Sequence, residues 1–446
     1  MSVLLVLFVG VILALYFWSK KNYNYWIERG FLSVPNVFPF GSMKGVATQV
    51  HSAERSDEFY KEHKGKAAGV GTFFFISPIF LVTDLETTKN ILVRDFSSFH
   101  DRGFYYNKKD DPTSANILAL EGSEWRERRV KLSPSFTSGK MKMMFEIVNT
   151  ISDKFISVID KDLKISSNLE MRELLAKFTT DVIGNVAFGI DSNCLENPNS
   201  EFRKYGKRLF DLSAFELLKF FMSAEFPNFS RALRLRQNPK EAGAFFLKTF
   251  VDTMQHRETS GIVRNDFVQL LLGLKKSGAF TAEELAAEGF IFYSGGFETS
   301  STLMVFCIYE LALNQDIQER LRDEIKSAID ENDGKLSYEM LVEMKYLDMV
   351  INETLRKYPP IPQHARKTTK EYKIPGTELI LEKGVSVHIP VFSFQRDPEY
   401  FPEPEVFDPE RFLPENVKSR HPFAFIPFGE GPRNYKTVFL TKFSTF

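Results

Sequence analysis

A short segment near the end of the chain combines glycine, proline and arginine in a pattern that suits ligand binding. The segment reads PFGEGPRNYKTVFL over residues 427–440. Glycine lets a backbone approach a flat ligand closely, and Arg433 supplies a permanently charged donor. The segment then continues directly into Tyr435. What Tyr435 does at this position decides whether the chain is a working enzyme.

A second set of residues places carboxylates opposite arginines. In NETLRKYPP (352–360), Glu353 and Arg356 are three residues apart on a predicted helix and therefore share a face. This spacing alone favours a surface ion pair worth only a few tenths of a kcal/mol. The segment PERF (409–412) adds Arg411 within a proline-rich stretch, and an arginine fork can bind a carboxylate through two hydrogen bonds.

A third set lies in a long predicted helix that begins at Thr281 and ends near Leu313. Thr281 and Glu284 form a capping box. The segment SGGFETSS (294–301) interrupts this helix with two glycines, each costing roughly 1 kcal/mol relative to alanine. Such glycines predict close approach of another group or a local distortion.

Thr299 and Glu298 in the same segment could organise water for proton transfer. The alternative for Thr299 is a hydroxyl bonded back to its own helix.

Composition excludes several classes of protein. The 446 residues are 43% hydrophobic and 26% charged, so the chain is globular. A net charge of −1 argues against nucleic-acid binding, and 45 phenylalanines predict an aromatic-rich interior. The two cysteines, Cys194 and Cys307, fit a reducing compartment and exclude a disulfide framework. No composition break divides the chain, which predicts one large body with a short appendage.

The N-terminus reads SVLLVLFVGVILALYFW over residues 2–18 and carries no charge. This length is at the lower limit for a membrane-spanning helix. A cleaved signal peptide is the alternative, but no cationic region precedes the apolar run. Lys20 and Lys21 follow it, which favours an uncleaved anchor with a cytoplasmic body. The prolines of SVPNVFPFGS (33–42) would stiffen the passage into the globular part.

The remaining pattern predicts a mainly α fold with a small β-rich portion. Two short strands around a turn at Ser77–Pro78 are expected in residues 69–84, and prolines with short β-like runs follow residue 360. Helices are predicted at 52–64, 123–132, 140–163, 171–190, 203–220, 240–256 and 281–313. The apolar segment 215–233, interrupted at Pro227, fits equally well a core element or a second surface that dips into a membrane.

Five motifs occur in order: W-x-x-x-R at Trp125–Arg129, GGFETS, E-x-x-R before YPP, PERF and F-x-x-G-x-R-N. Together with the apolar N-terminus they resemble a microsomal cytochrome P450, similar to the insect xenobiotic-metabolising members. The resemblance covers the chain up to Asn434. It implies haem b as cofactor and a monooxygenase that oxidises lipophilic small molecules.

The resemblance also implies roles for single residues. Those implied to contact haem or line the space near it are Trp125, Arg129, Gly295, Gly296, Arg366, Phe428 and Arg433, with His364 as a weaker candidate. Thr299 and Glu298 match the pair that delivers protons to iron-bound oxygen. Glu353, Arg356 and Arg411 match a buried structural triad. Arg126 and Arg128 are expected on the surface, and Phe104, Tyr105 and the aromatics at 210–221 are expected to be core rather than substrate-lining.

Tyr435 departs from the family pattern, which places a cysteine at this position. That cysteine supplies the axial thiolate that favours O–O cleavage, and neither Cys194 nor Cys307 is placed to replace it. Tyrosinate ligation is one explanation. The sequence after Asn434 does not resemble the family, which favours a truncated or misread end over a tyrosine-ligated enzyme.

The resulting expectation divides the chain into an anchor (1–19), a linker (20–45), an incomplete P450 domain (46–434) and an aberrant tail (435–446). Expected partners are NADPH-cytochrome P450 reductase, cytochrome b5, the endoplasmic reticulum membrane at its cytoplasmic face and a lipophilic substrate, with no nucleic acid. The alternative to an active enzyme is a catalytically dead isoform or a gene-model fragment without stable haem.

Overall fold

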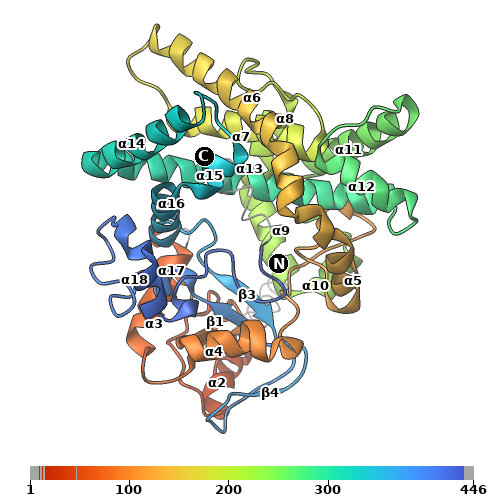
Figure 1. The fold of residues 1–446 in the computed structure, drawn as a ribbon. Coiled ribbons are helices and arrows are strands. Elements are labelled where there is room, and N and C mark those ends of the chain that lie inside the picture. Colours follow the sequence, from red (N-terminus) through yellow and green to blue (C-terminus); the bar gives the residue numbers. More distant parts are fainter. Residues whose placement is uncertain (1–9, 11–12, 14–15, 47, 436–446) are drawn as a thin grey trace. The chain divides into compact units, whose positions relative to one another are not determined.

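The computed structural model describes residues 10, 13, 16–46 and 48–435 (Figure 1). The chain divides into two compact units instead of the single body expected from composition. A sheet-containing unit comprises residues up to Gly103, Ile361–Val406 and Pro414–Asn434. A helical unit comprises Phe104–Pro360 and Phe407–Leu413, with Tyr435 assigned to it. The mainly α class with a small β-rich portion is confirmed.

The helical unit is built around α13, which spans Ala282–Leu313 and contacts α7, α11, α12 and α16. The elements of this unit are η3 (Pro112–Ser114), α5 (Gly122–Leu132), η4 (Ser133–Phe136), α6 (Ser138–Leu163), α7 (Met171–Phe188), α8 (Glu201–Phe210), α9 (Ala214–Glu225), α10 (Pro227–Ala232), α11 (Lys240–Ser260), α12 (Phe267–Lys276), α13, α14 (Gln315–Glu331), α15 (Tyr338–Glu343), α16 (Lys345–Lys357) and η5 (Pro409–Phe412).

The predicted start of α13 is confirmed. The backbone N–H of Glu284 donates to the Thr281 hydroxyl at 3.2 Å, and the Glu284 carboxylate accepts from the Thr281 N–H at 2.9 Å. The helix continues without a break through Gly295 and Gly296. A Cβ on Gly296 would lie 2.5 Å from Cδ1 of Ile183 on α7. Gly296 therefore permits close helix packing, whereas Gly295 has open space beside it.

The sheet-containing unit has a four-stranded sheet in the order β1–β2–β6–β3, in which β2 and β6 are parallel and the other pairs antiparallel. Its elements are α2 (Tyr25–Glu28), α3 (Ser52–His63), β1 (Gly69–Phe74), β2 (Ser77–Val82), α4 (Leu85–Lys89), η1 (Asn90–Arg94), η2 (Phe96–Ser98), β3 (His364–Lys367), β4 (Tyr372–Lys373), β5 (Ile380–Leu381), β6 (Ser386–Ile389), α17 (Val391–Gln395), α18 (Pro414–Ser419) and η6 (Pro422–Ala424).

The first hairpin turns two residues earlier than predicted. Phe74 pairs with Ser77, so Phe75 and Ile76 form the turn, with Phe75 at a φ of 50°. Pro78 lies inside β2, where it pairs with Phe73. Proline is tolerated there because the pairing of β2 with β6 starts one residue later, at Ile79, and no ladder hydrogen bond is lost on that side.

The apolar segment 215–233 forms α9 and α10, and the predicted helix at 203–220 is divided into α8 and α9 at residues 211–213. The side chains of this segment are mostly exposed instead of forming core. Phe215 is 69% exposed, and Leu218, Phe229 and Leu233 are each more than half exposed. The interpretation of this segment as a core element is therefore excluded for these four side chains.

Within the described part of the chain, we find no helix whose length and apolar character suffice to cross a membrane. The proposed anchor at residues 2–18 falls mostly outside the described residues, so the structure does not test it.

Candidate functional site

Three charged residues predicted to form a structural triad do lie together in the helical unit. Glu353 and Arg356 of α16 are fully buried. The Glu353 carboxylate accepts two hydrogen bonds from Arg356, at 2.6 and 2.8 Å, and one from the backbone N–H of Asp408 at 2.9 Å. Arg411 of η5 places its Nε 3.6 Å from the same carboxylate. The surface ion pair suggested by spacing alone is therefore wrong.

Burial raises the pKa of Glu353, and the guanidinium of Arg356 and the N–H of Asp408 act against that rise. The carboxylate joins α16 to the segment containing η5, two elements more than fifty residues apart in the chain. It thus fixes a tertiary contact, which is a structural role.

Helix α5 carries Trp125 and Arg129 one turn apart and hence on the same face. Trp125 is buried and Arg129 is half-buried. The neighbouring Arg128, expected on the surface, is instead only 4% exposed and binds Glu288 of α13 at 3.0 Å. Arg126 is exposed, as expected. Periodicity within α5 did not reveal the burial of Arg128, because its partners lie in other parts of the chain.

Thr299 and Glu298 lie in the middle of α13. The Thr299 hydroxyl donates to the carbonyl of Gly295 at 2.5 Å, which is the bond back to its own helix considered above. Glu298 lines a cleft of 960 Å³ together with Ser301 and Thr302 of the same helix. Of the two residues, only Glu298 is among the residues that line this cleft.

The lining of this cleft also contains a basic residue, Arg203, that sequence reasoning missed. Arg203 of α8 forms two hydrogen bonds with Glu173 of α7, at 3.0 and 2.7 Å. Burial acts to lower the pKa of Arg203, but Glu173 and the charge of Glu298 outweigh it and raise the pKa. Arg203 therefore stays cationic and provides positive potential near Glu298.

The glycine-rich loop of the sheet-containing unit buries Arg433. Its guanidinium donates to the carbonyl of His100 and lies 3.7 Å from the carboxylate of Asp101. Arg102, also buried, donates to the carbonyl of Arg433 at 2.8 Å. Arg102 was not predicted, and its position in the sequence carries no periodic signal that would have identified it.

Strand β3 adds further basic groups to this unit. His364 and Arg366 are two residues apart on the strand, share a face and are both buried. The Nε2 of His364 lies 2.9 Å from the carbonyl of Ile426. Burial, together with the charges of Arg366 and Arg102, lowers the pKa of His364 to about 3, although the hydrogen bond to Ile426 acts to raise it. His364 is thus neutral and donates to a carbonyl, whereas the arginines supply the charge.

Glycines fit the loop closely against its surroundings. Gly429 and Gly431 have φ values of 70° and 74°. A Cβ on Gly431 would lie 2.0 Å from the carbonyl oxygen of Leu92, and one on Gly429 would lie 3.3 Å from His364 Nε2. Phe428, between Pro427 and Gly429, is half-buried. The glycines are needed to seat this loop against η1 and β3.

Tyr435 and the two cysteine thiols are the remaining residues considered as iron ligands. Tyr435 is half-buried. Cys194 and Cys307 are buried in the helical unit, and burial raises the pKa of their thiols to about 12 and about 11. Cys194 contacts the Ser200 hydroxyl at 3.1 Å. Both thiols are therefore protonated, and neither has the character of a metal-binding thiolate.

The aromatic residues considered for a substrate cavity behave differently from one another. Tyr105 is buried and its hydroxyl donates to the carbonyl of Leu235 at 2.8 Å, which is a core role. Phe104 and Phe210 are largely exposed, against the expectation of ordinary core.

The family profile described as Cytochrome P450 matches residues 34–434. The chain is 44% identical over 438 residues to a protein named "Probable cytochrome P450 6a13" of Drosophila melanogaster, with 97% of this chain and 88% of that protein covered. It is 42% identical over 454 residues to "Cytochrome P450 6a2" of the same fly, covering 97% and 89%. It is 43% identical over 436 residues to "Cytochrome P450 6A1" of Musca domestica, covering 95% and 85%.

The chain belongs to the cytochrome P450 family. Its family activity is that of a haem-thiolate monooxygenase, and its family cofactor is haem. The residues of this chain fit that cofactor in one respect: Arg102, Arg366 and Arg433 are buried in one unit, and arginine suits a propionate because it is a planar, permanent donor. They do not fit in another, because Tyr435 stands where the family has its thiolate cysteine.

Proposed function

We propose that this chain binds haem b mainly through its arginines and belongs to the branch of the family that oxidises lipophilic small molecules. The observation that carries the proposal is the concentration of buried cations around Arg433. Arg102, Arg366 and Arg433 are each no more than 8% exposed, and Asp101 is the carboxylate that pairs with Arg433. A guanidinium suits a haem propionate because it is a planar, permanently charged donor that can bind a carboxylate through two hydrogen bonds.

In this proposal Arg366 and Arg433 would bind propionate oxygens, Phe428 would contact the cofactor, and Trp125 and Arg129 of α5 would also bind a propionate. Haem, when bound with a thiolate ligand, supplies the chemistry of O–O cleavage. The match over 34–434 supports a catalytic domain that covers residues 46–434. The proposed division also has an anchor (1–19), a linker (20–45), which the match overlaps from residue 34, and a tail (435–446) outside the match.

The residues proposed to move protons are Thr299 and Glu298. The Thr299 hydroxyl is oriented by its bond to the Gly295 carbonyl, so its oxygen remains able to accept a proton donor such as water. Glu298 borders the 960 Å³ cleft and is positioned to exchange protons with solvent. Gly295, with open space beside it, leaves room next to this pair. Glu353, Arg356 and Arg411 hold the surrounding fold and take no part in the chemistry.

The finer points of location and partners are also proposals. An NADPH-cytochrome P450 reductase would supply electrons, with cytochrome b5 as a second donor, at the cytoplasmic face of the endoplasmic reticulum membrane. The exposed apolar side chains of α9 and α10 support membrane contact, because several exposed large apolar side chains in one segment are unfavourable in water. Lys219 lies over the Phe215 ring at 5.2 Å, an arrangement compatible with a charged head near lipid headgroups.

A specific observation favours a second candidate, a chain without monooxygenase activity. Tyr435 supplies no thiolate, and both cysteine thiols are buried and protonated. The chain would then retain the fold of its family and bind haem weakly or through tyrosinate.

Reconstitution with hemin separates these candidates. The full chain and the variant Tyr435→Cys are titrated with hemin, reduced, and exposed to carbon monoxide while the Soret band is recorded. We expect the variant to gain the band of a thiolate-ligated haem and the unaltered chain to lack it. A thiolate band in the unaltered chain would exclude the inactive candidate, and no hemin binding by either protein would refute the role of the arginines.

A further inference from the structure

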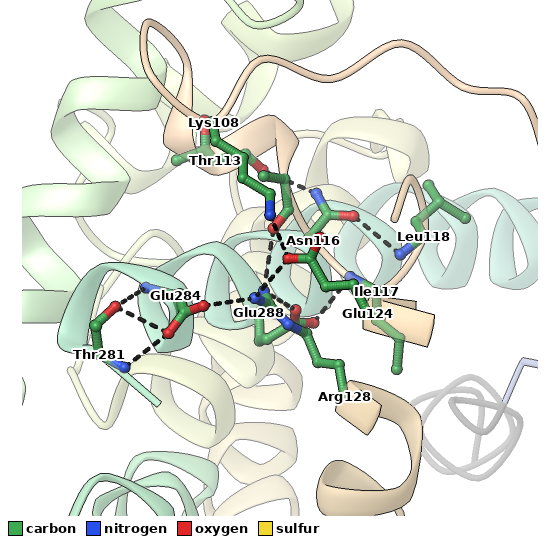
Figure 2. A network of polar contacts seen from close by, with 11 residues as sticks. Lys108, Thr113, Asn116, Ile117, Leu118, Glu124, Arg128, Thr281, Glu284 and Glu288 are labelled. Carbon is green, nitrogen blue, oxygen red and sulfur yellow. Dashed lines mark hydrogen bonds and ion pairs between the residues drawn. The ribbon is translucent and has the colours of Figure 1, made fainter. Parts of the chain in front are cut away.

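The polar network around Arg128 joins three elements of the helical unit (Figure 2). Arg128 of α5 donates to Glu288 of α13 at 3.0 Å and to Glu284 of the same helix at 3.0 Å. Arg128 also donates to the backbone carbonyl of Ala115 at 3.1 Å. The second oxygen of Glu288 accepts from the backbone N–H of Ile117 at 3.2 Å. Each partner of the ion pair therefore binds one backbone group of the loop at residues 115–117: Arg128 binds a carbonyl, and Glu288 binds an N–H.

This pair is poorly explained as a device for stability alone. Arg128 and Glu288 are 4% and 2% exposed. Desolvation of two charges offsets much of their attraction, so an apolar pair of similar volume is often as stable. An apolar pair, however, cannot satisfy the Ala115 carbonyl and the Ile117 N–H. The charges thus do something that packing cannot: they fix backbone groups of the loop at defined positions on α13.

The same pair sets the orientation of α5. Successive residues of an α-helix are separated by about 100° around its axis, so anchoring Arg128 fixes the direction of the neighbouring Arg129 and of Trp125. Its partner Glu288 lies on α13, the helix that carries Glu298 and Thr299. Lys108, which precedes η3, binds Glu124 of α5 at 2.5 Å and adds an exposed contact to α5.

We propose that Arg128 and Glu288 are positioning residues: together they fix the loop at residues 115–117 and the rotation of α5 on α13, and so hold Trp125 and Arg129 in place. The catalytic importance of that placement rests on the proposed function. The placement of Trp125 and Arg129 does not depend on the proposed function, and it can be measured without haem.

The experiment is hydrogen–deuterium exchange on the full chain at pH 8, following peptides that cover 113–120 and 122–132. The test variants are Arg128→Met and the double variant Arg128→Met with Glu288→Met. Matched controls make the same kind of change at exposed positions of the same helices: Arg126→Met on α5 and Glu283→Met on α13. Thermal unfolding of every variant is recorded in parallel.

We expect both test variants to exchange at least tenfold faster in residues 113–120 and in α5, and the controls to stay within twofold of the unaltered chain. The double variant should unfold at or above the temperature of Arg128→Met, because it leaves no uncompensated charge, and yet keep its fast local exchange. The unfolding temperature thereby reports on stability, and the local exchange rate reports on positioning. If Arg128→Met alone fails to fold, the double variant still decides the question.

Two outcomes would overturn the proposal. Exchange in the double variant equal to that of the unaltered chain would show that apolar packing positions the loop equally well. Faster exchange along the whole chain, together with a lower unfolding temperature in the double variant, would show a general stabilising role. Failure of hemin binding would refute the haem-binding proposal and leave this result unchanged.

Discussion

The Glu353 carboxylate and the Arg356 guanidinium face each other as two forks, joined by hydrogen bonds of 2.6 and 2.8 Å, and neither side chain is exposed to solvent. A second arginine–glutamate pair of the same unit, Arg320 with Glu410, has an ion-pair distance of 2.5 Å but lies largely exposed. The first pair is a buried fork and the second is an exposed ion pair, so the two test how burial changes the contribution of an arginine–glutamate pair.

Arg356→Lys should lower the free energy of unfolding by about 3 kcal/mol, since lysine cannot form the fork and weakens the hydrogen bonding of the buried Glu353 carboxylate. Arg320→Lys should change it by less than about 1 kcal/mol, because solvent screens an exposed pair. Urea unfolding of both variants measures the difference. Equal effects would show that burial of the Glu353 pair has no energetic consequence.

Replacement of Gly431 should disturb the loop that carries Arg433. Gly431 and Gly376 both have positive φ values, 74° and 79°, but only Gly431 would place a Cβ against a backbone oxygen, that of Leu92. Gly376→Ala should therefore cost about 1 kcal/mol from backbone strain alone. Gly431→Ala should cost about 1–3 kcal/mol more from the collision, measured by urea unfolding. Indistinguishable unfolding curves for the two variants would contradict the close packing of Gly431 on η1.

The two adjacent glycines of α13 should respond differently to alanine. Gly295→Ala should stabilise the chain by up to about 1 kcal/mol, because alanine has the higher helix propensity and open space is present. Gly296→Ala should lose that gain, since its Cβ would meet Ile183 at 2.5 Å. Thermal unfolding of both variants tests this. If Gly296→Ala raised the unfolding temperature more than Gly295→Ala, the conclusion that Gly296 is closely packed and Gly295 borders open space would be wrong.

Stability should depend on pH through Glu288. Burial raises the pKa of this carboxyl from 4.5 to about 7, although Arg128 acts to lower it. The folded chain therefore binds a proton that the unfolded chain releases, and stability falls as pH rises from 4.5 to 7. The difference in unfolding free energy between the unaltered chain and Glu288→Gln should decrease by about 3 kcal/mol over this window.

The control for the pH dependence is Glu283→Gln, an exposed position on the same helix. Its difference from the unaltered chain, measured over the same pH range, gives the slope with which that of Glu288→Gln is compared. A flat difference for Glu288→Gln would mean that Glu288 titrates alike in the folded and unfolded chains.

The apolar surface of α9 and α10 should enter lipid. Leu218→Trp places a fluorophore at a position that is 56% exposed, and Ile165→Trp places one at an exposed apolar position outside this surface. Each full-length variant is bound to vesicles whose lipids are brominated on their acyl chains, and its fluorescence is compared with that of the unaltered chain. The added signal from position 218 should be quenched, and the added signal from position 165 should not. Equal quenching at the two positions would refute membrane contact through α9 and α10.

Much of the architecture was predictable because its causes are local. The capping box at Thr281 defines the start of α13 within four residues, and the hydrophobic periodicity of α6, α7 and α11 defines helices without reference to the rest of the chain. The family was likewise readable from short motifs, and the comparisons confirm it.

The roles of several charged residues were not predictable from local pattern. Glu353 and Arg356 have the spacing of a surface pair, and Arg128 lies in a run of charges that reads as a solvated face. Their burial depends on distant partners: Asp408 for Glu353, and Ala115 and Glu288 for Arg128.

The sequence by itself determined the fold class, the family and the identity of Tyr435 at the position of the ligand cysteine, since motif order and residue identity need no coordinates. The tertiary structure alone decided which charges are buried, which of two adjacent glycines packs and which apolar segment stays exposed. These properties are set by neighbours far away in the chain, and the energy of a charge or an apolar side chain depends on those neighbours and on its access to water.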